Sequence, residues 1–116
     1  MLYELRKYTL QVGTMATVLD LYGKKGYPAF SDSEKARLVG YFTSDTGTLN
    51  QIVHLWRFKD DAERREHWKS VFSNAAFMEF AKELRPNILT QENQLLNEAP
   101  WGLSLIHISE PTRPNC

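Results

Sequence analysis

The sequence of 116 residues contains one cysteine, no excess of either charge and no long apolar run. Because the cysteine is the last residue, Cys116, an internal disulfide framework and a metal site built from several cysteines are excluded. Basic and acidic residues number 14 each, so the formal net charge is +0 and no basic stripe indicates a nucleic-acid partner. No segment reaches the roughly 18 apolar residues of a membrane helix, which argues against a membrane partner. The first residues also lack the pattern of a secretory signal, so we expect a cytoplasmic protein.

Motifs for metal binding and for nucleophilic catalysis are missing as well. The sequence has no HExxH segment and no pair of histidines at metal-ligand spacing. Its glycines do not form a phosphate-binding loop, and no nucleophile elbow is present. We therefore expect neither a metal nor a cofactor.

The clearest local pattern is an antiparallel hairpin. Residues 38–43 and 49–58 are rich in β-branched and aromatic side chains, and the turn residues 44–47 separate them. Alternation places a first set of side chains on one face of the second strand: Asn50, Ile52, His54, Trp56 and Phe58. The opposite face carries Val53 and Leu55, so both faces are apolar enough to need a cover. We expect the chain's own helices to cover one face, and a partner or a ligand to cover the other.

The other periodic segments complete the predicted fold. They predict, in order, a strand at 2–10, a helix from Thr14 to about Gly23 or Gly26, a loop at 31–33, a helix at 61–72, a short helix ending near Pro86 and a strand at 87–96. The order βαββαβ predicts an α+β, ferredoxin-like domain with a four-stranded antiparallel sheet and helices on one face. The first and third strands would be central, which would place Arg6 beside His54.

We expect one domain over residues 1–101, followed by a disordered tail. Residues 102–116 contain two prolines and no periodic pattern. The string SLIHISEPTRP also resembles a translated sequencing adaptor, an artefact of assembled reading frames. We leave this segment, including His107, out of the functional argument.

Six side chains are the candidates for a ligand-binding face of the sheet: Arg6, Tyr8, Asn50, His54, Trp56 and Glu92. His54 is also the catalytic candidate, because an imidazole can act as acid, base or haem ligand near neutral pH. The alternative is a half-buried histidine bonded to a neighbour. Arg6 either pairs with Glu92 inside the fold or binds a carboxylate or an enolate.

Three other aromatic side chains receive structural interpretations. We expect Trp56 to pack in the core or in a dimer contact, rather than to stack against a ligand. Tyr41 falls on the opposite face from His54 by strict alternation and is expected to pack under the helices. His67 lies among charged residues of the predicted helix 61–72, so we expect it to be solvated.

Three segments resemble the NIPSNAP family of the dimeric α/β-barrel superfamily: YELRKYTL, RLVGYFTSDTGTLNQIVHLWRF and RPNILTQENQLL. The resemblance covers about residues 2–101. It implies two ferredoxin-like protomers that pack sheet to sheet, which would cover the second apolar face. Related barrels include cofactor-independent monooxygenases, haem-degrading enzymes and small-molecule binders, and the shared fold does not choose among them.

The leading hypothesis is a homodimer that binds a small apolar organic molecule. A monomer would leave much of Ile52, Trp56 and Phe58 in water, and dimerisation would bury that face. Two alternatives stay open: a protein-interaction or scaffolding module without chemistry, and a cofactor-independent monooxygenase.

Overall fold

The computed structural model describes residues 1–102, so the predicted tail beyond Gly102 lies outside the described residues. The elements follow in the order β1 (Leu2–Leu10), α1 (Met15–Leu21), the π-helix η1 (Tyr22–Gly26), α2 (Tyr27–Ala29), α3 (Asp32–Ala36), β2 (Leu38–Thr43), β3 (Gln51–Phe58), α4 (Asp61–Ser73), α5 (Ala75–Leu84), the 3₁₀ helix η2 (Arg85–Asn87) and β4 (Ile88–Asn97). Within residues 1–102, no helix has both the length and the apolar character needed to cross a bilayer.

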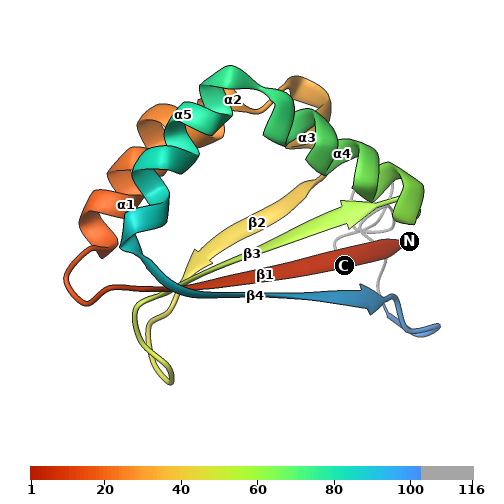
Figure 1. Cartoon of the computed structure of the whole chain (residues 1–116). Helices are drawn as coiled ribbons and strands as arrows, with labels where there is room; N and C mark the ends of the chain where they lie inside the picture. The colour runs from red at the N-terminus through yellow and green to blue at the C-terminus, as the bar shows by residue number, and fades with distance from the viewer. Residues whose placement is uncertain (103–116) are drawn as a thin grey trace, which may run out of the picture.

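The four strands form one antiparallel sheet in the order β2-β3-β1-β4. Figure 1 shows the helices arching over one face of this sheet, while the opposite face carries none of the described helices. This arrangement confirms the predicted ferredoxin-like α+β fold. The first and third strands are central, as predicted, and Arg6 lies directly opposite His54.

The helices cover one face of β3, the face that carries Ile52, His54, Trp56 and Phe58. These four side chains are at most 2% exposed. On β1, Tyr8 and Leu10 are buried on the same face. The prediction that Ile52, Trp56 and Phe58 need a partner chain to leave water was therefore wrong, because the chain's own helices bury them. The open face is the other one.

Because of a β-bulge, Tyr41 lies on the other face of the sheet from the one predicted. The pairing of β2 with β3 shifts between Leu38 and Gly40, so that Leu38 pairs with Trp56 and Tyr41 pairs with His54. An extra residue in a strand reverses the alternation beyond it. Tyr41 therefore lies on the same face as His54, although it does pack under the helices as expected.

Because of the register of β4, Glu92 lies on the other face of the sheet from the one predicted. Arg6 pairs with Asn93, and Glu92 pairs with Lys7. Since neighbouring residues of a strand point to opposite faces, Glu92 lies on the open face, away from Arg6. The predicted pairing of Arg6 with Glu92 was wrong.

Helical structure continues past both glycines that were predicted to end the first helix. The π-helix η1 contains Gly23 and Gly26, and Pro28 lies in the first turn of α2, where a missing backbone N–H is tolerated. A Cβ atom on Gly26 would lie 2.7 Å from the ring of Phe80. Glycine at this position therefore lets η1 approach α5 closely.

Two caps fix the helices that flank the hairpin. Ser31 and Glu34 form a capping box at the start of α3, where the sequence predicted a loop. Asp60 caps α4 by accepting a hydrogen bond from the backbone N–H of Glu63, as its position predicted.

Candidate functional site

A cavity of about 100 Å³ lies between the helices and the sheet. Its lining is aromatic and polar, and comprises Arg6, Tyr8, Tyr22, Phe30, Tyr41, His54, Trp68, Phe72, Phe77, Ala81, Leu84, Arg85, Ile88 and Gln91. An engineered apolar cavity of about 150 Å³ accepts a benzene molecule. The space here is of the same order, so it suits one small planar molecule.

Three of the six predicted site residues line this cavity, namely Arg6, Tyr8 and His54. The other three have different positions. Trp56 is fully buried in the core beside His54. Asn50 has a φ of 59° just before β3, and its carbonyl accepts a hydrogen bond from Leu10 N at 2.7 Å. Glu92 lies on the open face, so neither Asn50 nor Glu92 reaches the cavity.

The hydrogen bond between Trp56 and His54 determines which imidazole nitrogen carries the proton. The indole Nε1–H of Trp56 donates to Nδ1 of His54 at 2.7 Å. An indole N–H can only donate, so Nδ1 must accept and, in a neutral ring, Nε2 carries the proton. Burial and the charge of Arg6 lower the pKa of His54 to about 3. The ring is therefore neutral at physiological pH.

The Nε2–H group of His54 is buried without a hydrogen-bond partner among the described residues. Two aromatic rings lie against the imidazole. Tyr41 stacks on it with a centroid distance of 4.3 Å, and Tyr8 meets it edge-on at 5.1 Å. Since Nε2 is itself buried, an oxygen of a ligand reaches it only when a neighbouring side chain shifts.

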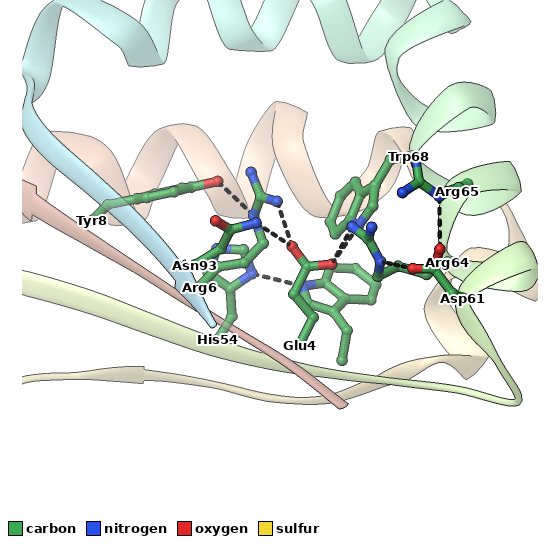
Figure 2. Close-up of polar contacts among 10 residues, drawn as sticks. Glu4, Arg6, Tyr8, His54, Asp61, Arg64, Arg65, Trp68 and Asn93 are labelled. Carbon is green, nitrogen blue, oxygen red and sulfur yellow. Dashed lines mark hydrogen bonds and ion pairs between the residues drawn. The ribbon is translucent and has the colours of Figure 1, made fainter. Parts of the chain in front are cut away.

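Arg6 lies beside His54 at the centre of a polar network, which Figure 2 shows. Its Nη1 donates to the carboxylate of Glu4 at 2.8 Å, and its Nε donates to the hydroxyl of Tyr8 at 3.2 Å. The guanidinium carbon also lies 4.5 Å from the ring centroid of Trp68. Arg6 is thus held in one orientation at the wall of the cavity.

Glu4 is the structural partner of Arg6 and is 0% exposed. Besides Arg6, its carboxylate accepts hydrogen bonds from Trp68 Nε1 at 2.8 Å and Asn93 Nδ2 at 3.0 Å. Arg64 adds an ion pair at 3.5 Å. Burial alone would raise the pKa of Glu4, but the hydrogen bonds from Asn93, Trp68 and Arg6 lower it below its usual value. Glu4 is therefore ionised at neutral pH.

Two further tyrosines complete the polar lining. The rings of Tyr22 and Tyr41 lie 5.2 Å apart, and burial raises the pKa of both phenols above the ordinary value. Their hydroxyls therefore stay protonated and can donate hydrogen bonds into the cavity.

The NIPSNAP family model matches residues 3–102. The chain belongs to the NIPSNAP family. It is 29% identical over 103 residues to protein NipSnap homolog 3A from Homo sapiens and from Pongo abelii, covering 85% of this chain. The chain spans only 40% of the length of these curated relatives.

Solved structures agree with this assignment. A NIPSNAP family protein of unknown function from Agrobacterium tumefaciens is 30% identical, with a TM-score of 0.77 over 88% of this chain and 91% of that protein. An antibiotic biosynthesis monooxygenase is similar at a TM-score of 0.62, with 15% identity over 86% of this chain and 100% of that one. At that identity the second similarity concerns the fold alone.

The tautomer of His54 limits the chemistry open to this NIPSNAP domain. A general base or a haem ligand needs an imidazole nitrogen with a free lone pair. The Nδ1 lone pair of His54 is taken by Trp56, and Nε2 carries a proton. In this arrangement His54 is a neutral hydrogen-bond donor. No group of three or more His, Cys, Asp or Glu side chains within residues 1–102 could hold a metal ion.

The expectation that His67 is solvated was wrong. It is 0% exposed, its Nδ1 lies 3.2 Å from Arg37 Nη1, and its Nε2 is without a partner in the described part of the chain. Arg37 can only donate, so Nε2 again carries the proton in the neutral ring. The rings of Trp68 and Trp56 surround it at 4.5 and 4.8 Å. Unlike His54, His67 does not line the cavity, which makes it a matched control.

Sequence reasoning missed Tyr22, Tyr41, Trp68 and Glu4 as parts of the site. A signal for Glu4 was present, because it shares the alternation of Arg6 and Tyr8 on β1. Tyr22 and Trp68 come from the helical layer, and no local pattern of the sequence relates that layer to a particular strand. The bulge near Gly40 concealed Tyr41.

Proposed function

We propose that this NIPSNAP domain binds one small, mainly apolar organic molecule in the cavity between helices and sheet. The observation that carries the proposal is the buried Nε2–H of His54, which has no partner within residues 1–102 and belongs to a ring that lines this cavity. The walls formed by Phe30, Trp68 and Phe77 suit a planar apolar body. Ligand pockets combine such walls with a few polar groups that orient the ligand.

The energetic cost of the free donor supports this proposal. A buried donor left without a partner costs about 1–3 kcal/mol of stability. A ligand oxygen that accepts from Nε2 of His54 would offset that cost, once the side chains that cover Nε2 have shifted. Such a ligand has an apolar ring or chain and one oxygen acceptor.

Titration with acetophenone, a planar ring bearing one carbonyl, tests the proposal by NMR. We expect saturable shifts at cavity residues in the unmodified protein. His54→Phe removes the donor and should weaken binding by about tenfold, the equivalent of one neutral hydrogen bond. His67→Phe removes an equally buried histidine away from the cavity and should leave the affinity of the folded protein unchanged. Absence of binding, or equal losses in both variants, would contradict the proposal.

We also propose that the domain works as a homodimer through the open face of the sheet. Leu5 and Leu55 pair across β1 and β3 on this face, and Val53 lies beside them. All three are only half-buried in the isolated chain. A second copy would remove this apolar surface from water, at about 25 cal/mol per Å² before the costs of association.

Sedimentation equilibrium at micromolar concentration tests the dimer. We expect Leu55→Lys to shift the protein to monomer, raising the dissociation constant at least about a hundredfold, because it buries an unpaired charge in the interface. Val12→Lys is the control, since Val12 is 84% exposed and lies outside the sheet. A well-folded unmodified protein that stays monomeric over this range would refute the dimer.

A further inference from the structure

We infer that the ligand of this cavity is an anion, and specifically a small aromatic carboxylate. The inference rests on the proposed function and adds the charge of the ligand to it. The first observation is the character of the polar lining. Each polar side chain that lines the cavity can donate a hydrogen bond and none is acidic: Arg6, Tyr8, Tyr22, Tyr41, His54, Arg85 and Gln91. A lining without carboxylates favours a ligand rich in acceptors.

The charge of the surrounding network is positive. The carboxylate of Glu4 forms ion pairs with Arg6 and Arg64. Asp61 forms ion pairs with Arg64 and Arg65. This network therefore holds three guanidinium groups against two carboxylates. Glu4 and Asp61 balance Arg6 and Arg64, and the excess charge lies on Arg65, which is 73% exposed at its side chain and does not line the cavity. At the cavity wall an anion would therefore bind through the N–H groups of Arg6 that Glu4 and Tyr8 leave unused, next to a guanidinium that is already paired.

Arg6 has N–H groups to spare. Its hydrogen bonds to Glu4 and Tyr8 use Nη1 and Nε, and no described residue accepts from Nη2. A guanidinium has five N–H donors in a planar fork, which matches the two oxygens of a carboxylate. Because Glu4 and Tyr8 already fix the orientation of Arg6, a ligand need not order this side chain.

Arg85 adds a second positive charge at the edge of the cavity. It follows α5 in η2, is exposed, and forms no ion pair within residues 1–102. Gln91 of β4 lines the same cavity. A cationic side chain on the rim of a pocket attracts anions and raises their rate of entry. The apolar walls and the volume of about 100 Å³ limit the rest of the ligand to about one ring.

Three probes of nearly equal shape test the charge of the ligand: benzoate, benzamide and benzamidine. Each is titrated by NMR into the 116-residue chain at about pH 7.5 and low salt. We expect benzoate to bind at least about tenfold more tightly than benzamide, because its hydrogen bonds to arginine are charge-assisted. Benzamidine should bind more weakly than benzamide. Equal affinities, or a preference for benzamidine, would overturn the inference and leave the proposed function standing. Failure of all three probes at about 10 mM would overturn both.

A matched pair of variants locates the charge that matters. Arg85→Gln should weaken benzoate binding by about three- to tenfold and should weaken benzamide binding clearly less. Lys82→Gln removes the same charge from an exposed position on α5 that does not line the cavity, and should alter neither affinity. Both side chains are exposed, so both variants should fold. An equal effect of the two substitutions would mean that the general charge of the surface, and not this cavity, selects the anion.

Discussion

Glu4→Gln is expected to lower the free energy of unfolding by about 3–5 kcal/mol, although it only replaces one carboxylate oxygen with an amide NH2 group. The carboxylate of Glu4 is 0% exposed and compensates the partly buried guanidinium of Arg6 at 2.8 Å. The amide would remove that compensation and would turn an N–H group toward the donors of Trp68, Asn93 or Arg64. Urea unfolding of the two proteins at neutral pH measures the difference.

Two further variants separate this network from ordinary surface ion pairs. Asp61 forms ion pairs with Arg64 and Arg65 but is 48% exposed at its side chain. Asp61→Asn should therefore cost clearly less stability than Glu4→Gln. The double variant Glu4→Gln/Arg6→Met should lose clearly less stability than the sum of its single variants, because it leaves no uncompensated charge. A cost below about 1 kcal/mol for Glu4→Gln would show that Arg6 does not depend on Glu4.

The sequence pattern was sufficient to predict the sheet and the pairing of Arg6 with His54. Period-two alternation in β1 and β3 placed Arg6, Tyr8 and His54 together on one face, because both strands run without a bulge where they pair with each other. It did not show that the chain's own helices cover this face. The resemblance to NIPSNAP proteins agreed with that fold. Neither argument depended on contacts with the helices, which is why both gave the correct strand order.

Errors in the predicted site follow from irregular backbone and from the helical layer. The bulge between Leu38 and Gly40 moved Tyr41 to the other face, and the β1–β4 pairing shifts between Thr9 and Leu10. Gly40 inside the strand is a sequence signal for the first irregularity that the alternation argument did not use, whereas the second has no marked signal. The helix α4 is rich in charge, so a buried His67 was hidden among solvated neighbours. Its burial depends on tertiary packing against the rings of Trp56 and Trp68.

The second large effect expected is acid sensitivity, because two histidines are held neutral inside the fold. Burial and a nearby arginine lower the pKa of His54 to about 3 and that of His67 to about 4. In the unfolded chain both return to about 6.5, so below that pH the unfolded state binds protons that the folded state does not. This contribution to stability is complete above about pH 6.5 and is lost as the pH falls toward the folded pKa values.

We therefore expect the free energy of unfolding to be about 4 kcal/mol lower at about pH 5 than at about pH 7.5, about 2 kcal/mol from each histidine. The lowered pKa values of Glu4 and Glu34 act in the same direction, but only below about pH 4.5, where their contributions are lost. Urea unfolding at the two pH values measures the histidine effect alone. His54→Phe and His67→Phe should each halve the difference in the free energy of unfolding between the two pH values, whatever each substitution costs in stability at pH 7.5. Equal stability of the unmodified protein at both pH values would show that its histidines titrate normally, and that Nε2 of His54 is not the fixed neutral donor on which the binding proposal depends.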